Sequence, residues 1–188
     1  MRKVTAGLFV SLDGVVESPE RWQLPYFNDE MGEAVGVAMA ATDAMLLGRV
    51  TYQEFASYWP GVSAEEQPFV DHMSNTPKYV VSRTLEGPLE WNKSTLIRGN
   101  VAEEITRLRQ QPGENIGITG SATLVQSVLR EDLLDELWLM IHPVVVGAGR
   151  RLFGEGGGLK ALELVNSKTF STGVVSLTYQ PAGKEVEG

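Results

Sequence analysis

The sequence predicts an α/β domain with a mostly parallel β-sheet, helices on both faces and an antiparallel hairpin at the C-terminal end. The first observation is a repeated unit, in which a short apolar run ends at a glycine-led turn and a helix-like segment follows. The second is the stretch 160–180, where alternating apolar residues on both sides of Ser171, Thr172 and Gly173 are typical of two hairpin strands.

The elements follow from these patterns in chain order. Asn28 and Asn100 are expected to cap helices, the latter with Glu103 at the capping-box position, and Ser121 is expected to cap a third. Pro143 lies inside a long apolar run and suggests a bulge there. Strands are expected at 3–12, 44–47, 78–82, 95–98, 116–119, 135–146 and twice within 160–180, and helices at 28–41, 64–73 and 121–130, after Gly48 and after Asn100.

Length and composition indicate one globular domain over residues 1–188. The chain is 43% hydrophobic and 21% charged, which is ordinary for a protein with a sizeable core. It has no cysteine, which excludes disulfides, thiolate zinc sites and a cysteine nucleophile. His72 and His142 are too few and too far apart to suggest a metal centre, so no metal is expected.

The charge and the hydropathy exclude two classes of partner. A formal net charge of −8 argues against a nucleic-acid or anionic-membrane surface, although it leaves room for a local arginine site. The apolar run 4–10 ends at Asp13 and Gly14, too early for a signal peptide, and no segment is long enough to span a membrane. We therefore expect a cytoplasmic protein with a small-molecule substrate.

The stretch 115–130 contains the most informative turn. A short strand leads to Gly120 and Ser121, and a helix with one apolar stripe follows. Because a helix N-terminus presents free N–H groups and a partial positive charge, such a junction is suited to bind phosphate. The alternative interpretation is an ordinary strand-to-helix connection.

A second junction adds a charge that helix energetics do not explain. Gly48 follows the strand at 44–47, and Arg49 stands in the first turn of the next helix, where a cation is disfavoured. An anionic ligand would account for Arg49, since guanidinium can grip phosphate with two parallel hydrogen bonds. Ser82 and Arg83 end the next strand, although an arginine there can also be a solvated surface residue.

The first strand ends in a loop that leads to an aromatic segment. Asp13 stands at the carboxyl end of the strand, where open α/β sheets bind ligands, but Asp-Gly is also a common turn. Trp22 and Tyr26 follow in a polar stretch that is either a surface loop pinned by its aromatic residues or a flap over a pocket.

The ordered set of motifs resembles the dihydrofolate reductase superfamily, and most closely the reductase domain of the bacterial bifunctional riboflavin-biosynthesis deaminase/reductase. The motifs are SLDG, LLGRVTY, VVSR, ITGSATL and PVVVGAGRRLF, and together they cover nearly the whole chain. Each is weak alone, whereas their order is fairly specific. The resemblance implies a dihydrofolate reductase-like fold with an eight-stranded sheet. The zinc-binding deaminase half of the riboflavin enzyme is absent from this chain.

The resemblance also implies NADPH as cofactor. Gly48, Arg49 and Thr51 would hold one side of the pyrophosphate and the adenosine phosphate, and Ser82 and Arg83 would meet the 2′-phosphoribose. The other side of the pyrophosphate would lie on a run of residues in the late junction: Gly120, Ser121, Ala122, Thr123 and Leu124. The arginines favour NADPH over NADH.

The substrate site is less defined. Asp13 is the candidate catalytic residue that contacts substrate, because no secure counterpart exists of the buried acid that dihydrofolate reductases carry on their first helix. Asp29, with Glu30 and Glu33, lies near that place, but acids in a first helical turn usually serve the macrodipole. Loops around four further residues are expected to form the pocket: Trp22, Tyr26, Trp59 and Arg150.

The leading hypothesis is an NADPH-dependent reductase that transfers hydride to a C=N or C=O carbon of a small heterocycle, with 5-amino-6-(5-phosphoribosylamino)uracil and a pterin as examples. One alternative, the usual dinucleotide fold, lacks a G-x-G-x-x-G after the first strand. Another is a nucleotide-binding module without turnover. A homodimer is expected from the apolar C-terminal strands and from the behaviour of riboflavin-type relatives.

Overall fold

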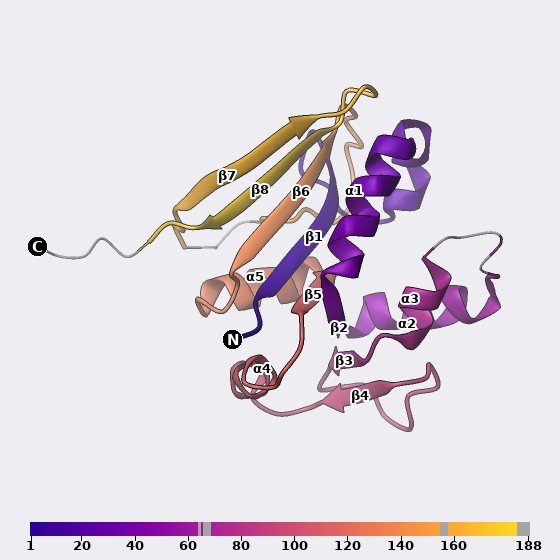
Figure 1. Cartoon of the computed structure of the whole chain (residues 1–188), viewed down its shortest axis with the longest axis vertical. Helices are drawn as coiled ribbons and strands as arrows, with labels where there is room; N and C mark the ends of the chain where they lie inside the picture. Colours follow the sequence, from indigo (N-terminus) through magenta and orange to yellow (C-terminus); the bar gives the residue numbers. More distant parts are fainter. Residues whose placement is uncertain (64, 66–68, 155–157, 184–188) are drawn as a thin grey trace, which may run out of the picture.

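In the computed structural model, which describes residues 1–63, 65, 69–154 and 158–183, one twisted sheet of eight strands runs through the molecule (Figure 1). The strand order is β4-β3-β2-β5-β1-β6-β8-β7. All pairs from β4 to β6 are parallel, and the β6–β8 and β8–β7 pairs are antiparallel. The predicted mostly parallel sheet with an antiparallel C-terminal hairpin is therefore confirmed.

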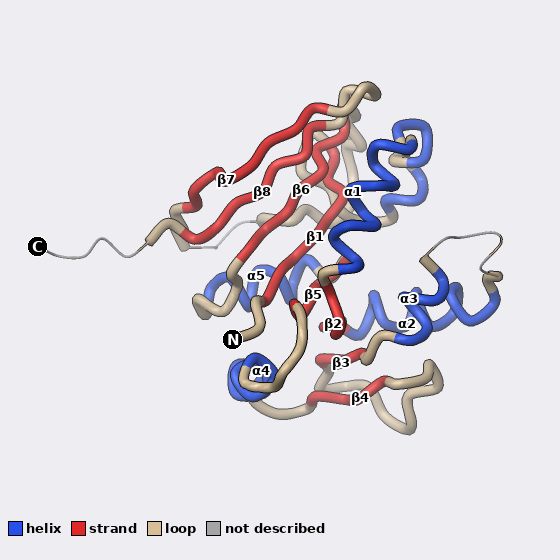
Figure 2. Tube along the Cα trace, viewed as in Figure 1, coloured by secondary structure: helices blue, strands red, loops and turns tan. Residues whose placement is uncertain are grey.

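The elements alternate along most of the chain, as the tube in Figure 2 shows. The strands are β1 (Val4–Ser11), β2 (Thr42–Gly48), β3 (Lys78–Val81), β4 (Ser94–Ile97), β5 (Asn115–Thr119), β6 (Glu136–His142), β7 (Leu162–Thr169) and β8 (Val175–Pro181). The α-helices are α1 (Asp29–Ala40), α2 (Arg49–Tyr58), α3 (Val70–Asn75), α4 (Val101–Arg109) and α5 (Ala122–Arg130). Three 3₁₀ turns complete them: η1 (Pro19–Arg21), η2 (Leu24–Tyr26) and η3 (Trp59–Gly61).

Helices cover both faces of the sheet. On one face, side chains of β1, β2, β5 and β6 pack against α4 and α5, with Ile105, Leu108 and Val125 fully buried. On the other face, α2 and α3 cover β2 and β3, while α1 packs over β6 through Met31. Because both faces of the central strands are covered, their apolar runs are nearly continuous in the sequence.

The topology brings six strand ends to one edge. The strands β4, β3, β2, β5, β1 and β6 are consecutive neighbours and run parallel, so their carboxyl ends all meet at the same edge of the sheet. The candidate residues after each of these strands therefore lie along one line. In open α/β sheets this edge is the usual place for a ligand.

Two predicted elements differ from the structure. The strand expected at 135–146 ends at His142, because Pro143 has no N–H to continue the ladder and the Val144 N–H bonds back to the His142 carbonyl. The helix expected at 64–73 begins at Val70 and continues to Asn75, while residues 64 and 66–68 of that prediction lie outside the described residues.

Two of the three predicted helix caps are confirmed with their capping hydrogen bonds. The Asn28 side chain accepts from the Met31 N–H (3.1 Å), and the Asn100 side chain accepts from the Ala102 N–H (3.1 Å). Ser121 is the N-cap residue of α5, as predicted, but its side chain makes no capping bond and its hydroxyl bonds across to the neighbouring junction instead. Across the described residues, no helix combines the length and the apolar character needed to cross a membrane.

Lys78 is a buried charge at the amino end of β3. Its side chain is fully buried, and Nζ donates to the carbonyls of Ser74 (2.9 Å) and Asn92 (3.3 Å). It also lies 4.1 Å from the centroid of the Trp91 ring. Burial, with a smaller effect of Lys93, lowers the pKa of Lys78 to about 8.

This burial predicts a stability that rises with pH. Between pH 8 and 10.5 the unfolded chain binds more protons at Lys78 than the folded protein does, so the free energy of unfolding should increase there, by about 1–3 kcal/mol. Lys78→Met should remove this increase in urea titrations at several pH values. Lys3→Met, at an exposed lysine, is the control and should keep it. Equal pH dependence in both variants would contradict the assignment.

Candidate functional site

The two glycine-led junctions contact each other. The Gly48 N–H donates to the Ser121 hydroxyl (2.9 Å), and the same hydroxyl donates to Thr51 Oγ1 (2.9 Å). The Ser121 N–H also donates to Thr51 Oγ1 (3.1 Å). The starts of α2 and α5 therefore lie side by side at the sheet edge, and their partial positive charges point to one region.

The contact requires glycine at position 120 and leaves little space for a side chain at position 48. A Cβ atom at Gly120 would lie 2.9 Å from Thr51 Cγ2, and the φ angle of 69° at Gly120 is itself unfavourable for other residues. A Cβ atom at Gly48 would lie 3.2 Å from the Ser121 hydroxyl oxygen. Ser121 adopts a left-handed conformation (φ 35°, ψ 55°), which costs about 1–2 kcal/mol for a non-glycine residue. Such strain is typical of functional turns.

Three exposed arginines accompany these junctions. Arg49 begins α2, Arg83 follows β3 and Arg98 follows β4. None of the three forms an ion pair with the described residues, and the one hydrogen bond among them joins Arg49 Nη1 to Gln53 Oε1 (3.2 Å). In a protein with a net charge of −8, this row of cations without a carboxylate partner favours an anionic ligand.

A cavity of about 420 Å³ lies beside two of these arginines. Its walls come from the loops after β3 and β4, the start of α4 and one side of α5. The lining residues are Arg83, Arg98, Gly99, Asn100, Val101, Ser127 and Glu131. Glu131 is bonded to the Ser127 hydroxyl (3.4 Å), so the cavity has an acidic as well as a basic side.

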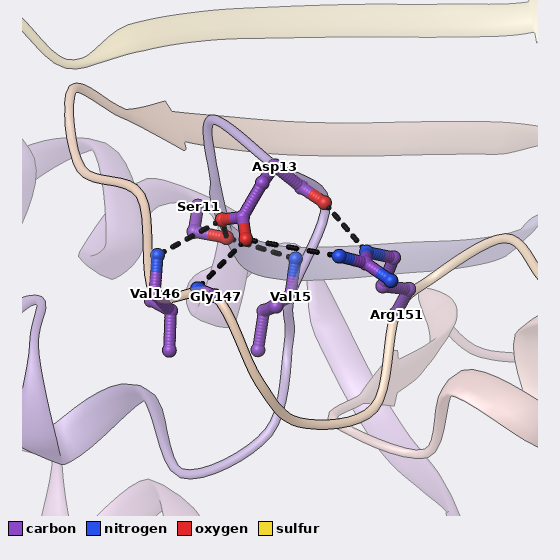
Figure 3. A network of polar contacts seen from close by, with 6 residues as sticks. All are labelled: Ser11, Asp13, Val15, Val146, Gly147 and Arg151. Carbon is purple, nitrogen blue, oxygen red and sulfur yellow. Dashed lines mark hydrogen bonds and ion pairs between the residues drawn. The ribbon is translucent and has the colours of Figure 1, made fainter.

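Asp13 is the centre of a polar network between the first loop and the loop after β6 (Figure 3). Its carboxylate accepts from the Ser11 hydroxyl (2.7 Å) and from the N–H groups of Val146 (3.0 Å) and Gly147 (2.9 Å). Arg151 adds an ion pair at 3.9 Å and donates from Nε to the Asp13 carbonyl (2.9 Å). The hydrogen bonds from Ser11, Val146 and Gly147 lower the pKa of Asp13 to about 2.

This environment suits a fixed, ionised carboxylate. Both oxygens are engaged, and a pKa near 2 leaves no proton to give at neutral pH. The arrangement is thus better suited to positioning the two loops than to proton donation. Contact of Asp13 with a substrate stays a prediction.

The aromatic segment packs on a histidine. The rings of Trp22 and Tyr26 lie with their edges against His142, at centroid distances of 5.2 Å and 5.9 Å. His142 ends β6 and is fully buried. Two predicted pocket residues are therefore brought together around a side chain that had no predicted role.

The other three predicted substrate residues belong to other elements, and Arg150 is linked to Trp22 through Glu17. Asp29 is exposed in the first turn of α1, and Arg150 is exposed while its N–H donates to the Glu17 carboxylate (2.6 Å). Trp59 follows the C-terminal end of α2 and packs on Phe55 in the cluster beneath α2 and α3. The structure does not place Trp59 with Trp22 and Tyr26.

Sequence reasoning gave Arg98 and His142 no place in the site. Arg98, like Arg83, directly follows a parallel strand. Ligands bind at the carboxyl ends of such strands, so Arg98 could have been predicted on the same ground. His142 is a titratable residue inside an otherwise apolar strand, which is a signal worth following. No cluster of His, Cys, Asp or Glu suited to a metal occurs in the part of the chain that the structure describes.

Comparison with known proteins gives the family. The family model of the RibD C-terminal domain matches residues 2–176. This chain belongs to the RibD C-terminal domain family. A relative of this chain, the uncharacterized protein YyaP of Bacillus subtilis (strain 168), is 32% identical over 186 residues. The match covers 95% of this chain and 94% of YyaP.

Solved structures support the fold of this RibD C-terminal domain. The putative riboflavin biosynthesis protein of Shewanella sp. PV-4 has a TM-score of 0.77 and 24% identity, with 96% of this chain and 99% of that chain covered. The Thermotoga maritima diaminohydroxyphosphoribosylaminopyrimidine deaminase/5-amino-6-(5-phosphoribosylamino)uracil reductase has a TM-score of 0.66 and 15% identity. There the match covers 96% of this chain and 57% of the longer protein. The predicted dihydrofolate reductase-like fold and family resemblance are confirmed.

The contact between the two turns predicts that one added methyl group at position 120 strongly lowers the stability of the fold. Gly120→Ala should lower the free energy of unfolding by about 2 kcal/mol or more, because the new Cβ meets Thr51 and φ is positive. Urea denaturation measures this loss. Gly61→Ala is the matched control, since nothing lies within 4 Å of its added Cβ. Similar stabilities for the two variants would contradict the described contact.

The Asp13 network predicts an acid-sensitive stabilisation. Because the pKa falls from 3.8 to about 2, the contribution is complete above pH 4 and is lost as the pH falls toward 2. Asp13→Asn should therefore lower the melting temperature at pH 7, and its deficit relative to the unmutated protein should shrink at pH 2.5. Glu90→Gln, at an exposed carboxylate, should show no such pattern.

Proposed function

We propose that this RibD C-terminal domain is an NADPH-dependent reductase that transfers hydride to a C=N or C=O carbon of a small heterocyclic substrate. The observation that carries the proposal is the meeting of two glycine-led helix starts beside three arginines that form no ion pair with the described carboxylates. The comparison adds support, since the similar Thermotoga maritima protein is a diaminohydroxyphosphoribosylaminopyrimidine deaminase/5-amino-6-(5-phosphoribosylamino)uracil reductase.

The groups at the sheet edge fit a phosphorylated dinucleotide in kind and in order. The free N–H groups of α2 and α5 suit the pyrophosphate, with Arg49 at one side. Arg83 and Arg98 suit the 2′-phosphate, and the cavity of about 420 Å³ beside them suits the adenosine. The nicotinamide end would then extend along the edge toward β1 and β6. NADPH fits this series of charges better than NADH, which has no 2′-phosphate for the arginine pair.

When bound, the cofactor would supply the hydride. The protein would hold the two rings in contact, orient them with the loops after β1 and β6, and exclude water. Asp13 would fix those loops through its bonds to Val146 and Gly147. A bound water is the proposed source of the proton, because the ionised Asp13 has none to give.

The arginine pair predicts a loss of cofactor specificity on mutation. Arg83→Ala and Arg98→Ala should each raise the Kd for NADPH about tenfold, since each removes a charge-assisted bond to phosphate. The Kd for NADH should hardly change. Titration of cofactor fluorescence measures both. Arg130→Ala, at the far end of α5, is the control and should bind like the unmutated protein.

Three outcomes would decide against the proposal. Absence of saturable NADPH binding, or an unchanged affinity in Arg49→Ala, would remove its basis. Binding without NADPH oxidation, across pterins, phosphoribosylaminopyrimidines and quinones, would favour a nucleotide-binding module without turnover.

A homodimer is also proposed, from the exposure of the C-terminal edge strand. Every β7 residue after Leu162 is exposed, including Leu164 (49%) and Val165 (46%). In Figure 1 the β7–β8 hairpin extends beyond the helices that cover the rest of the sheet. Light scattering should give twice 20.6 kDa, whereas a 20.6 kDa species alone would rule the dimer out.

A further inference from the structure

His142 has no defined role in cofactor binding, yet its surroundings are unusual for a packing residue. It is fully buried at the carboxyl end of β6. Three rings meet it edge-on, from Phe9 (5.6 Å), Trp22 (5.2 Å) and Tyr26 (5.9 Å). One ring comes from β1 and the other two from the segment between η1 and the end of η2.

The hydrogen bonds of this imidazole are incomplete. Nδ1 lies 2.9 Å from the Met140 carbonyl, and since a carbonyl only accepts, Nδ1 carries the proton. Nε2 then has a free lone pair, and it is buried without a hydrogen-bond partner. Burial lowers the pKa of His142, and the carbonyls of Met140 and Val10 oppose that shift only in part, so the ring is held neutral. A buried acceptor without a donor is costly, and such groups often have a functional reason.

Two further unpaired polar atoms belong to neighbouring segments. Gln23 Oε1 is buried without a partner, and Gln23 directly follows Trp22. Thr172 Oγ1 is likewise unpaired, in the β7–β8 turn between Phe170 and Val174, which share a hydrophobic cluster with Phe9 and Tyr26. Of the five buried unpaired side-chain atoms among the described residues, three therefore belong to this neighbourhood.

The segment over His142 is joined by hydrogen bonds to the rest of the protein at its two ends. Its ends are fixed: the Val16 N–H donates to the Arg150 carbonyl (2.9 Å), and Asn28 Nδ2 donates to the Ser171 hydroxyl (3.0 Å). Between these ends, the backbone bonds of residues 18–27 stay within the segment. The Trp22 indole also bonds locally, to the Glu17 carbonyl (3.1 Å). Trp22 and Tyr26 can therefore leave the His142 ring without breaking a backbone hydrogen bond between residues 18–27 and the rest of the protein.

The place of His142 along the sheet edge suits a substrate. Its strand lies beside β1, with Ser11 opposite His142, and β1 lies beside β5, whose end carries the Gly120 turn. Two strand spacings, about 10 Å, separate β5 from β6 across the sheet, and His142 also lies three residues further along the strand direction than Gly120. The arginines after β3 and β4 lie at the opposite end of the same edge.

We propose that His142 Nε2 is the hydrogen-bond acceptor of a subsite for a planar heterocycle with a ring N–H group, covered by residues 18–27. The lactam edge of a pyrimidinedione or a pterin has this chemistry. The ring N–H would donate to Nε2, and Trp22 and Tyr26 would move from the imidazole onto the plane of the heterocycle. The identification of the bound heterocycle as a substrate rests on the proposed reductase function. Binding at this subsite does not depend on NADPH.

NMR can test the subsite in the unmutated protein. His72 and His142 are the only histidines, so imidazole ¹⁵N spectra contain two sets of signals. The probe is 5,6-diaminouracil, and its N-methylated analogue 5,6-diamino-1,3-dimethyluracil lacks the ring N–H groups. The diaminouracil should shift the Nε2 signal of His142 and leave that of His72, on α3, unchanged. No shift at His142, or equal shifts with the dimethyl analogue, would overturn the proposal.

A variant gives an independent readout. His142→Phe keeps a ring in the aromatic cluster and removes the acceptor, so the Kd for diaminouracil should rise about tenfold, the value of one hydrogen bond. Weak binding of the dimethyl analogue should not change. His72→Phe is the control. If His142→Phe does not fold, the NMR experiment on the unmutated protein decides alone.

The two proposals fail in different ways. If NADPH does not bind but diaminouracil shifts His142, the reductase function fails and the subsite stands. If NADPH is bound and oxidised while His142 responds to neither compound, the reductase stands and the subsite is wrong.

Discussion

One hydroxyl group joins the two halves of the candidate site. The Ser121 side chain accepts from the Gly48 amide and donates to Thr51, so it links the start of α2 to the start of α5. The two helix starts follow neighbouring parallel strands, and this link fixes one turn against the other. The left-handed backbone of Ser121 is the local cost of this arrangement, and the glycines at 48 and 120 provide the space for it.

The arginines of the molecule fall into two groups, those paired with carboxylates and those at the candidate site. The chain as a whole is acidic, and its arginines elsewhere are often neutralised: Arg2 pairs with Asp43, Arg107 with Glu104 and Arg109 with Asp135. Along the ends of β2, β3 and β4 this pairing stops. A local field of this kind attracts one anionic ligand while the net charge of −8 discourages polyanions such as nucleic acids.

Much of the fold was predictable because local signals and topology agree. Each apolar run ends at a turn residue, and parallel strands joined by helices place all those turns on one edge, so the positions of Gly48, Arg83 and Gly120 followed from the sequence. The contact of Ser121 with Thr51 could not be predicted from the sequence, because the two residues are seventy positions apart and capping propensity describes only local bonds. Asp13 and His142 stand out in the sequence, but their contacts do not, because each depends on a distant loop whose geometry no local pattern encodes.

The strand order has a consequence for synthesis of the chain. The central strand β1 is made first, yet its neighbours β5 and β6 begin only at Asn115 and Glu136. A growing chain therefore exposes β1 with both edges unpaired until β5 has been made, and with one edge unpaired until β6 follows. Chaperone binding to the nascent N-terminal segment would protect it during this interval, and the late pairing also implies slow folding of the released protein.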